Sequence, residues 1–261
     1  MKITSRENSK IRYLHRLQTQ KNFRKKEKLF LVEGTTVVRT ALENEISLKD
    51  LILCPDLCRE YEEIRGLAEK AGIAITEVST KCFEKISDVK TPQGAAAAIR
   101  RKSATPEQIL GCKNAVVICC HGIQDPGNLG TLIRTADAAG ASGVITFPPS
   151  ASFYNPKCIR SSSGSILRVP AASMKTPDFV REVKARDFHL YAATPSGGQD
   201  FRKIDFQRPC CLIIGSEAHG LPPSLFKISQ PVTIPMRKGV ESLNAAISGS
   251  LILYQMIEKN S

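Results

Sequence analysis

The sequence lacks the features that mark several classes of protein. Within its 261 residues no apolar run approaches the roughly 18 residues of a membrane-spanning helix, and no apolar run follows the basic residues at its start. We therefore expect no membrane span, no signal peptide and a cytoplasmic location. The fingerprint GxGxxG after an opening strand is also missing, which argues against a dinucleotide-binding oxidoreductase.

Cysteine spacings typical of metal sites are absent as well. The nine cysteines are odd in number, spread along the chain, and include no CxxC pair. The pairs at 119–120 and 210–211 lie in apolar runs, where cysteine behaves as a small hydrophobic residue. We expect reduced thiols packed in a core, with neither a disulfide framework nor a metal site.

Charge of one sign dominates the chain, which has a formal net charge of +12. Residues 1–28 hold ten Lys or Arg and two Glu, a local net charge of +8. A basic run can be a solvated helix face, but Lys and Arg also neutralise phosphates, and we favour nucleic acid as the partner. A membrane surface fits less well, because Ile11, Leu14 and Leu17 form only a short apolar stripe.

Length and a hydrophobic content of 42% predict two domains. In the first, residues 1–105, apolar runs alternate with helical patterns, which predicts a small α/β/α domain. A polar segment with Pro106 then separates this domain from the second, residues 106–261. The apolar runs expected to be strands in the first domain are 29–34, 48–54, 73–78 and 94–99.

The second domain is predicted to be an α/β fold with a largely parallel sheet covered on both faces. Ligands of such sheets bind beyond the carboxyl ends of the strands, so the loops that follow the apolar runs are the candidate site. The runs are 115–123, 143–147, 189–195, 210–217 and 231–236.

Three of these loops carry distinctive residues. In the first, Pro126 and Gly127 predict a turn, Asn128 is a candidate helix cap, and Arg134 falls on the solvent side of the helix that follows. By itself, this pattern is also what an ordinary helix cap followed by a surface arginine would give. The second, residues 212–222, leaves a buried strand as GxExxG, which is a weak signal by itself.

The third loop, residues 234–256, leads into a long helix. Ser242 is predicted as the N-cap of this helix, which leaves Asn244, a mediocre helix former, unexplained in the first turn. The apolar positions of this predicted helix include Leu243, Ala246, Ile247, Leu251 and Tyr254.

In combination, the three loops resemble the SpoU-type RNA ribose methyltransferases. That family has Asn-x-Gly-x-x-x-Arg, then Gly-x-Glu-x-x-Gly, then Ser-Leu-Asn before the last helix, and all three occur here in order. Residues 155–170 match as well, so the resemblance spans residues 113–258. It implies a SPOUT fold with a deep C-terminal trefoil knot, which general rules against threaded chains would not predict.

The resemblance also implies a reaction: S-adenosylmethionine donates a methyl group to a ribose 2′-hydroxyl of RNA, without a metal. Arg134 is implied to contact the RNA, but a guanidinium, with a pKa above about 12, is a poor base. We expect its charge to stabilise the developing alkoxide instead. The implied catalytic residues are Asn128, Arg134, Glu217, Ser242 and Asn244, and the implied cofactor-binding residues are Thr194, Gly215, Ile234, Met236 and Leu243.

The N-terminal half is similar to the L30e-like substrate-binding domain that precedes many SpoU-type enzymes, in residues 4–18 and the FLVEG that follows. This implies that residues 1–105 bind RNA and that the chain acts as a homodimer, in which Arg134 of one subunit reaches across to the other subunit. Ribosomal RNA is favoured over transfer RNA. A non-catalytic RNA-binding or ribosome-assembly protein is the alternative, but it would need neither Arg134 nor Glu217 nor Asn244.

Overall fold

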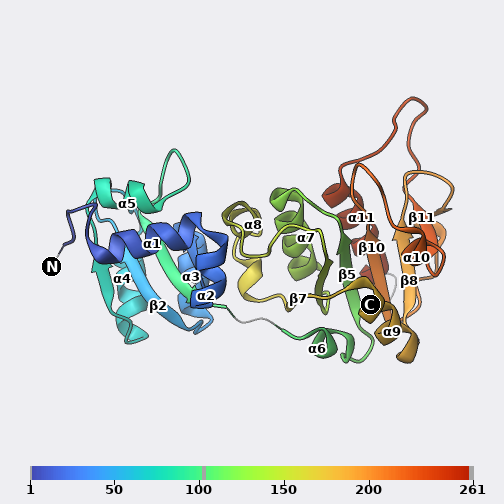
Figure 1. Cartoon of the computed structure of the whole chain (residues 1–261), viewed down its shortest axis with the longest axis horizontal. Helices are drawn as coiled ribbons and strands as arrows, with labels where there is room; N and C mark the ends of the chain where they lie inside the picture. Colours follow the sequence, from blue (N-terminus) through green and yellow to red (C-terminus); the bar gives the residue numbers. More distant parts are fainter. Residues whose placement is uncertain (1, 102–103, 259–261) are drawn as a thin grey trace. The chain divides into compact units, whose positions relative to one another are not determined.

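A computed structural model describes residues 2–101 and 104–258 of the chain, which forms two compact units (Figure 1). One unit is Met1–Lys102 together with Tyr154–Leu167, and the other is Ser103–Phe153 together with Arg168–Ser261. The chain therefore passes from one unit to the other three times. Among the helices of the described residues, none is long and apolar enough to cross a membrane.

The first unit is built on a four-stranded sheet of order β1-β4-β2-β3. The central strand β4 (Ala95–Arg100) pairs antiparallel with β1 (Leu29–Glu33) and β2 (Leu48–Leu53), and β3 (Ile75–Glu77) pairs parallel with β2. The four alanines of β4 are almost fully buried. Their small side chains allow elements on both faces to come close to the sheet.

Helices pack on this sheet, and the apolar stripe of the basic segment belongs to the resulting core. Ile11, Leu14 and Leu17 are each 0% exposed and lie in one cluster with Phe83. The basic segment is thus part of the fold, with most of its lysine and arginine side chains exposed. The helices are α1 (Ser9–Thr19), α2 (Lys21–Glu27), α3 (Thr35–Glu43), α4 (Tyr61–Lys70) and α5 (Thr80–Ile86).

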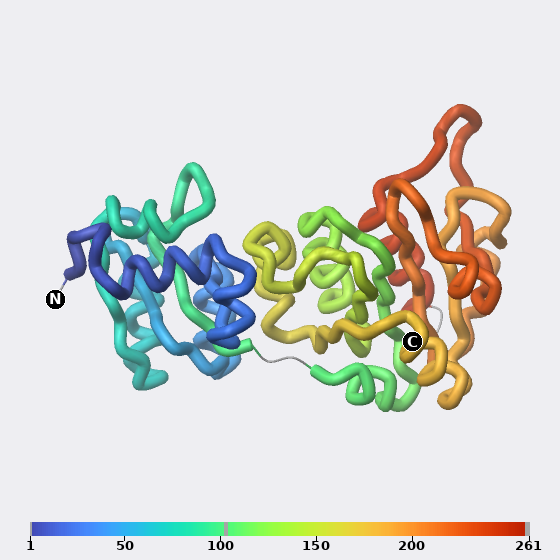
Figure 2. Tube along the Cα trace, in the orientation of Figure 1, coloured from blue at the N-terminus to red at the C-terminus, as the bar shows by residue number. Residues whose placement is uncertain are grey.

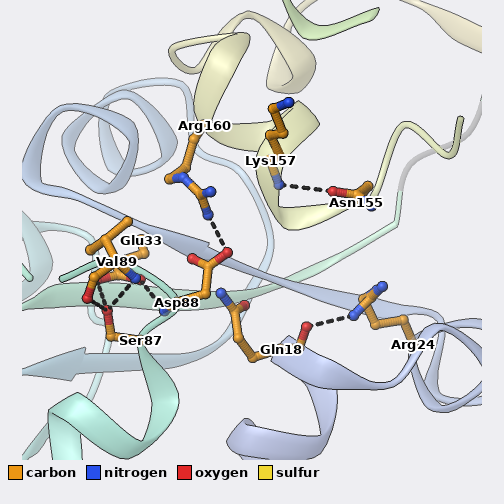
Figure 3. A network of polar contacts seen from close by, with 9 residues as sticks. All are labelled: Gln18, Arg24, Glu33, Ser87, Asp88, Val89, Asn155, Lys157 and Arg160. Atoms are coloured by element: carbon orange, nitrogen blue, oxygen red, sulfur yellow. Dashed lines mark hydrogen bonds and ion pairs between the residues drawn. The ribbon is translucent and has the colours of Figure 1, made fainter. Parts of the chain in front are cut away.

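Not every basic residue of this segment is free to meet a partner. Arg24 is buried and donates hydrogen bonds of 2.8 Å to the carbonyl oxygens of Leu17 and Gln18. Figure 3 shows the bond to Gln18. Burial lowers the pKa of its guanidinium. Three further cations are held in ion pairs, Lys2 with Asp56, Arg6 with Glu84, and Lys10 with Asp50.

Residues 154–167, which carry α8 (Pro156–Ser161) and the short 3₁₀ helix η1 (Ser165–Leu167), pack in the first unit. The Tyr154 ring lies 5.0 Å from that of Phe30, and the guanidinium of Arg101 lies 3.9 Å from the Tyr154 ring. Arg160 forms an ion pair with Asp88 (Figure 3). No sequence pattern indicated this association.

The second unit contains a seven-stranded sheet of order β7-β6-β5-β10-β8-β11-β9, in which every pairing is parallel. The prediction of a parallel sheet is therefore confirmed, and Figure 2 allows the chain to be followed through it. The strands are β5 (Val116–His121), β6 (Gly143–Phe147), β7 (Ala171–Ser173), β8 (His189–Ala193), β9 (Gln199–Asp200), β10 (Cys210–Ile214) and β11 (Gln230–Thr233).

The segment that was expected to be a polar spacer contains a helix, α6 (Pro106–Leu110). A capping box explains its start, because Thr105 accepts from the backbone of Gln108 while the Gln108 side chain accepts from the backbone of Thr105. The other helices of this unit are α7 (Pro126–Ala139), α9 (Thr176–Ala185), the short 3₁₀ helix η2 (Phe201–Lys203), α10 (Pro223–Phe226) and α11 (Ala245–Glu258).

The last helix returns to pack against α7 and β10. A Cβ on Gly249 would lie only 2.7 Å from Leu132 and 3.2 Å from Ile214, so a small residue sets how closely α11 approaches both. The hydroxyls of Thr135 and Ser250 are 2.7 Å apart at the same contact. Two further small residues, Ala245 and Ala246, are buried at the start of α11.

The apolar positions that the sequence analysis assigned to this helix do not all lie on its buried side. Ala246 is buried, but Ile247, Leu251 and Tyr254 are 52%, 45% and 51% exposed, and Leu243 precedes the helix. Small residues allow the close approach of α11 to α7, and Ile252, Leu253 and Met256 continue the buried side along the helix. Large apolar residues thus lie on both sides of α11.

The burial of the cysteines generates a prediction. All nine are free thiols, and Cys112 alone is exposed. Burial raises the pKa of Cys158 and Cys210 to about 12, which suppresses the reactive thiolate. We expect Ellman's reagent to react rapidly with a single thiol in the native protein, and Cys112→Ser to abolish that reaction. Rapid reaction of several thiols without denaturant would contradict this packing.

Candidate active site

The loops after β8, β10 and β11 meet at one edge of the second unit, because the strands are parallel. They line a cavity of about 190 Å³ together with the start of α11. The cavity wall includes all five residues that the resemblance implied for the cofactor, Thr194, Gly215, Ile234, Met236 and Leu243.

The chemistry of this wall is mixed. Ile214, Ile234 and Ile252 supply an apolar surface, and the hydroxyl-bearing residues Ser242 and Ser248 supply polar groups. A largely apolar cavity with a few polar groups is the usual form of a site for a small organic molecule. The lining therefore fits an amphipathic ligand of nucleoside type.

A tight turn after β10 shapes one side of the cavity. The backbone N–H of Gly220 donates to the carbonyl of Ser216 at 2.9 Å, and the N–H of Ser216 donates back to Gly220 at 3.2 Å. A Cβ on Gly215 would lie 2.5 Å from the carbonyl carbon of Gly220. Gly215 is required here because no side chain fits between the two arms of the turn.

Glu217 lies at the tip of this turn, and its carboxylate gathers donors from two other segments. Oε1 accepts from Nδ2 of Asn128 at 2.7 Å, from Nδ2 of Asn244 at 3.3 Å, and from the backbone N–H of Ala245 at 3.4 Å. Asn244 Nδ2 also donates to Oδ1 of Asn128 at 3.0 Å. Three residues named from the sequence thus form one hydrogen-bonded cluster, the Asn128–Glu217–Asn244 cluster.

The helix caps differ from those predicted. Oδ1 of Asn244 accepts from the N–H groups of Ala246 and Ile247, so Asn244 caps α11 and Ser242 does not. Asp125 caps α7, which starts at Pro126. Asn128 therefore lies in the first turn of α7, where its side chain is free to reach Glu217.

Not all of the residues named from the sequence come together. Ser242 lines the cavity, as Glu217 does. Arg134 is exposed on α7, six residues beyond Asn128, and it does not line this cavity in the part of the chain that the structure describes. Within one chain, the Asn128–Glu217–Asn244 cluster thus forms without Arg134.

Some residues that shape the site were missed at the sequence level. Gly249 is a glycine inside a helical pattern, which is a recognised sign of close packing and could have been read as one. Ser216 carries no signal beyond its place in the turn, because its role depends on the facing Gly220.

Comparison with known families identifies this arrangement. The profile of the SpoU rRNA Methylase family matches residues 115–254, and that of the MRM3-like substrate binding domain matches residues 8–97. The chain belongs to the SpoU rRNA methylase family. The two matches agree with the implied order of a substrate-binding domain followed by a SpoU domain.

Curated relatives of the SpoU family match along nearly the whole chain. The 23S rRNA (guanosine(2553)-2'-O)-methyltransferase RlmP of Bacillus subtilis is 32% identical over 255 residues, which cover 97% of this chain and 98% of that protein. The 23S rRNA (uridine(2479)-2'-O)-methyltransferase of Streptomyces viridochromogenes is 29% identical, with 99% and 92% covered.

A solved structure of the family agrees with the fold. The AdoMet-bound rRNA methyltransferase of Sinorhizobium meliloti aligns with a TM-score of 0.86 and 28% identity, covering 98% of this chain and 97% of that one. The second unit therefore has the SPOUT methyltransferase fold that the resemblance implied.

The Gly215 turn generates a prediction. Gly215→Ala forces the two arms of the turn apart, and overpacking of this kind costs about 1–3 kcal/mol. We expect the midpoint of denaturant unfolding to fall accordingly. Gly66→Ala is the control, since Gly66 lies in α4 with open space around it, and we expect it to stabilise by about 0.5–1 kcal/mol. Equal stability of the two variants would show that the turn tolerates a side chain.

Proposed function

We propose that this chain transfers a methyl group from S-adenosylmethionine to a ribose 2′-hydroxyl of ribosomal RNA. The observation that carries the proposal is the Asn128–Glu217–Asn244 cluster at the wall of a nucleoside-sized cavity, in a member of the SpoU family. Relatives that align over nearly the whole chain are named as 23S rRNA 2'-O-methyltransferases. Since ribosomal RNA is the proposed substrate, we infer action in the cytoplasm.

The cavity is the proposed cofactor site. Backbone groups of the loops at Thr194, Gly215 and Ile234, together with Met236 and Leu243, would hold the adenosine and methionine parts of the donor. When bound, S-adenosylmethionine supplies an electrophilic methyl group on a sulfonium. The position of β10 between β5 and β8, with α11 back on α7, supports the implied trefoil knot around this site.

Two kinds of group would act on the acceptor hydroxyl. The Asn128–Glu217–Asn244 cluster, with Ser242 nearby in the sequence, holds polar atoms in fixed positions at the cavity wall before the substrate binds. Such prior positioning would raise the rate of methyl transfer, because less freedom of motion is lost when the reacting groups meet. The guanidinium of Arg134 would stabilise the negative charge that develops on the 2′-oxygen. In that step the O–H bond would break with its proton passing to water, and the methyl group would leave the sulfur of the donor as its bond to the oxygen forms.

An exposed apolar face on α11 supports a homodimer. Ile247, Leu251 and Tyr254 recur at spacings of four and three residues, so they lie on one side of the helix, and each is about half exposed. A second copy of the chain would cover this face. In such a dimer, Arg134 of one subunit completes the cluster of the other, as the resemblance implies.

Residues 1–105 are the proposed RNA-binding domain, and residues 106–261 the catalytic domain. The match of residues 8–97 to a substrate-binding domain supports the first assignment, as does the cluster of exposed lysines on α2. Within the described residues Lys21, Lys25 and Lys26 form no ion pair, unlike Lys10 of α1 and Arg6, which precedes that helix. These lysines are the best candidates for phosphate contacts.

Mixing two inactive variants tests the reaction and the dimer together. The assay is methylation of ribosomal RNA purified from a strain that lacks the gene. Wild-type enzyme with S-adenosylmethionine should restore a single lost 2′-O-methyl site. Asn128→Ala and Arg134→Ala should each lower the single-turnover rate by at least about a hundredfold, because each removes transition-state stabilisation.

An arginine that acts across the dimer gives a distinctive result in the mixture. A heterodimer of the two variants has one complete site and one doubly defective site, so an equal mixture after subunit exchange should regain about a quarter of wild-type activity. No recovery, despite exchange shown with tagged subunits, would place Arg134 in the same subunit's site. Near wild-type rates for either single variant would refute the catalytic assignment.

The lysines of α2 generate a separate prediction about RNA affinity. Each lost phosphate contact should reduce the slope of log affinity against log salt by about 0.7–0.9. We expect Lys21→Ala, Lys25→Ala and Lys26→Ala together to flatten the slope by about 2 and to weaken binding of the ribosomal RNA. The charge-matched control is the triple alanine variant of exposed Lys70, Lys184 and Lys227, which should leave the slope unchanged. Equal slopes for both triples would exclude α2 as a contact.

A further inference from the structure

A second cavity adjoins the proposed cofactor cavity. It has a volume of about 160 Å³ and is lined by the loop after β5, including Gln124, and by the turn after β10, including His219. Ser216 and Glu217 line both cavities, so they form a shared wall. Asn128 lines the second cavity, which places the Asn128–Glu217–Asn244 cluster between the two spaces.

The second cavity is held in shape by backbone contacts. Gly122 has a φ of +69°, and a Cβ there would lie 3.2 Å from Cβ of Ser216, so the two loops touch at their bases. The carbonyl of Ile123 accepts from Ala151 at 2.8 Å. The hydroxyl oxygen of Ser216 accepts from the backbone N–H of His219 at 2.9 Å. A ligand would therefore meet preformed walls.

Two side chains of the lining have no part in this framework. Gln124 and His219 are both exposed, and within the described residues neither side chain makes a hydrogen bond or ion pair. The Gln124 amide offers a donor and an acceptor side by side, which matches the hydrogen-bonding edge of a base. The imidazole of His219 offers a flat face on which an unstacked base can stack.

We propose that the second cavity receives the base of the target nucleotide, with Gln124 reading its hydrogen-bonding edge and His219 stacking on its face. This inference rests on the proposed function. The shared wall fits it, because a base in the second cavity puts its own ribose beside Asn128 and Glu217, where the 2′-hydroxyl faces the cofactor cavity. The ligand is one nucleotide splayed out of an RNA loop.

Steady-state kinetics with two RNA transcripts tests the reading of the base. One transcript carries the methylated site as mapped with wild-type enzyme, and the other has a different base at that nucleotide. We expect Gln124→Ala to raise KM for the native transcript and to reduce the preference between the two by about ten- to hundredfold. Affinity for S-adenosylmethionine, measured by calorimetry, should stay within about twofold of wild type, because the cofactor lies beyond the shared wall.

Two variants of His219 test the stacking. His219→Ala should raise KM for RNA with kcat little changed, and His219→Phe should restore it, since phenylalanine keeps the flat face but not the ring nitrogens. Failure of phenylalanine to restore KM overturns the stacking role. Unchanged KM and base preference in Gln124→Ala overturn the reading role. If wild-type enzyme leaves the ribosomal RNA unmethylated, the proposed function itself fails, and these variants then have no activity to alter.

Discussion

The site depends on the hydrogen bonds that the carboxylate of Glu217 accepts. It binds donors from the first turn of α7, 89 residues earlier, and from the start of α11, 27 residues later. Hydrogen bonds to a charged acceptor are each worth about 1.5–3 kcal/mol. One side chain thus fixes the relative positions of three segments whose own secondary structure would allow them to separate. Because Glu217 lies where these three segments meet, it lines both the cofactor cavity and the second cavity.

Small residues make that convergence possible. Gly215 allows the turn after β10 to close on itself, and Gly249 allows α11 to come close to Leu132 and Ile214. A helix that approaches its neighbours this closely brings Asn244, its cap, within reach of Glu217 and Asn128. The polar cluster therefore depends on close packing at two glycines, where there is no side chain to hold the neighbouring segments apart.

Much of this could be predicted from the sequence, but for different reasons at different positions. Runs of buried apolar residues predicted the parallel sheet, and three spaced motifs together named Asn128, Glu217 and Asn244. The buried face of α11 could not be predicted, because large apolar residues occur on both sides of this helix: Ile252 and Leu253 are buried, whereas Ile247 and Leu251 are about half exposed. The caps were misplaced since Asp, Asn and Ser are similar N-caps, and only the fold decides which of them the chain reaches.

The division of the chain into units followed no sequence pattern beyond the break near residue 105. Residues 154–167 lie within the segment that matches the SpoU family, yet their packing partners are Phe30, Asp88 and Arg101 of the first unit. Such an association depends on contacts between residues far apart in the chain, which periodicity does not encode.

The three chain passages between the units limit how this protein can vary in evolution. A substrate-binding domain joined by a single linker could be exchanged between relatives as one contiguous cassette. Here a replacement of residues 1–102 would leave Tyr154 and Arg160 facing a foreign surface. Changes at Phe30 or Asp88 therefore need matching changes some 70 to 125 residues away, so the two parts of the chain are expected to diversify together.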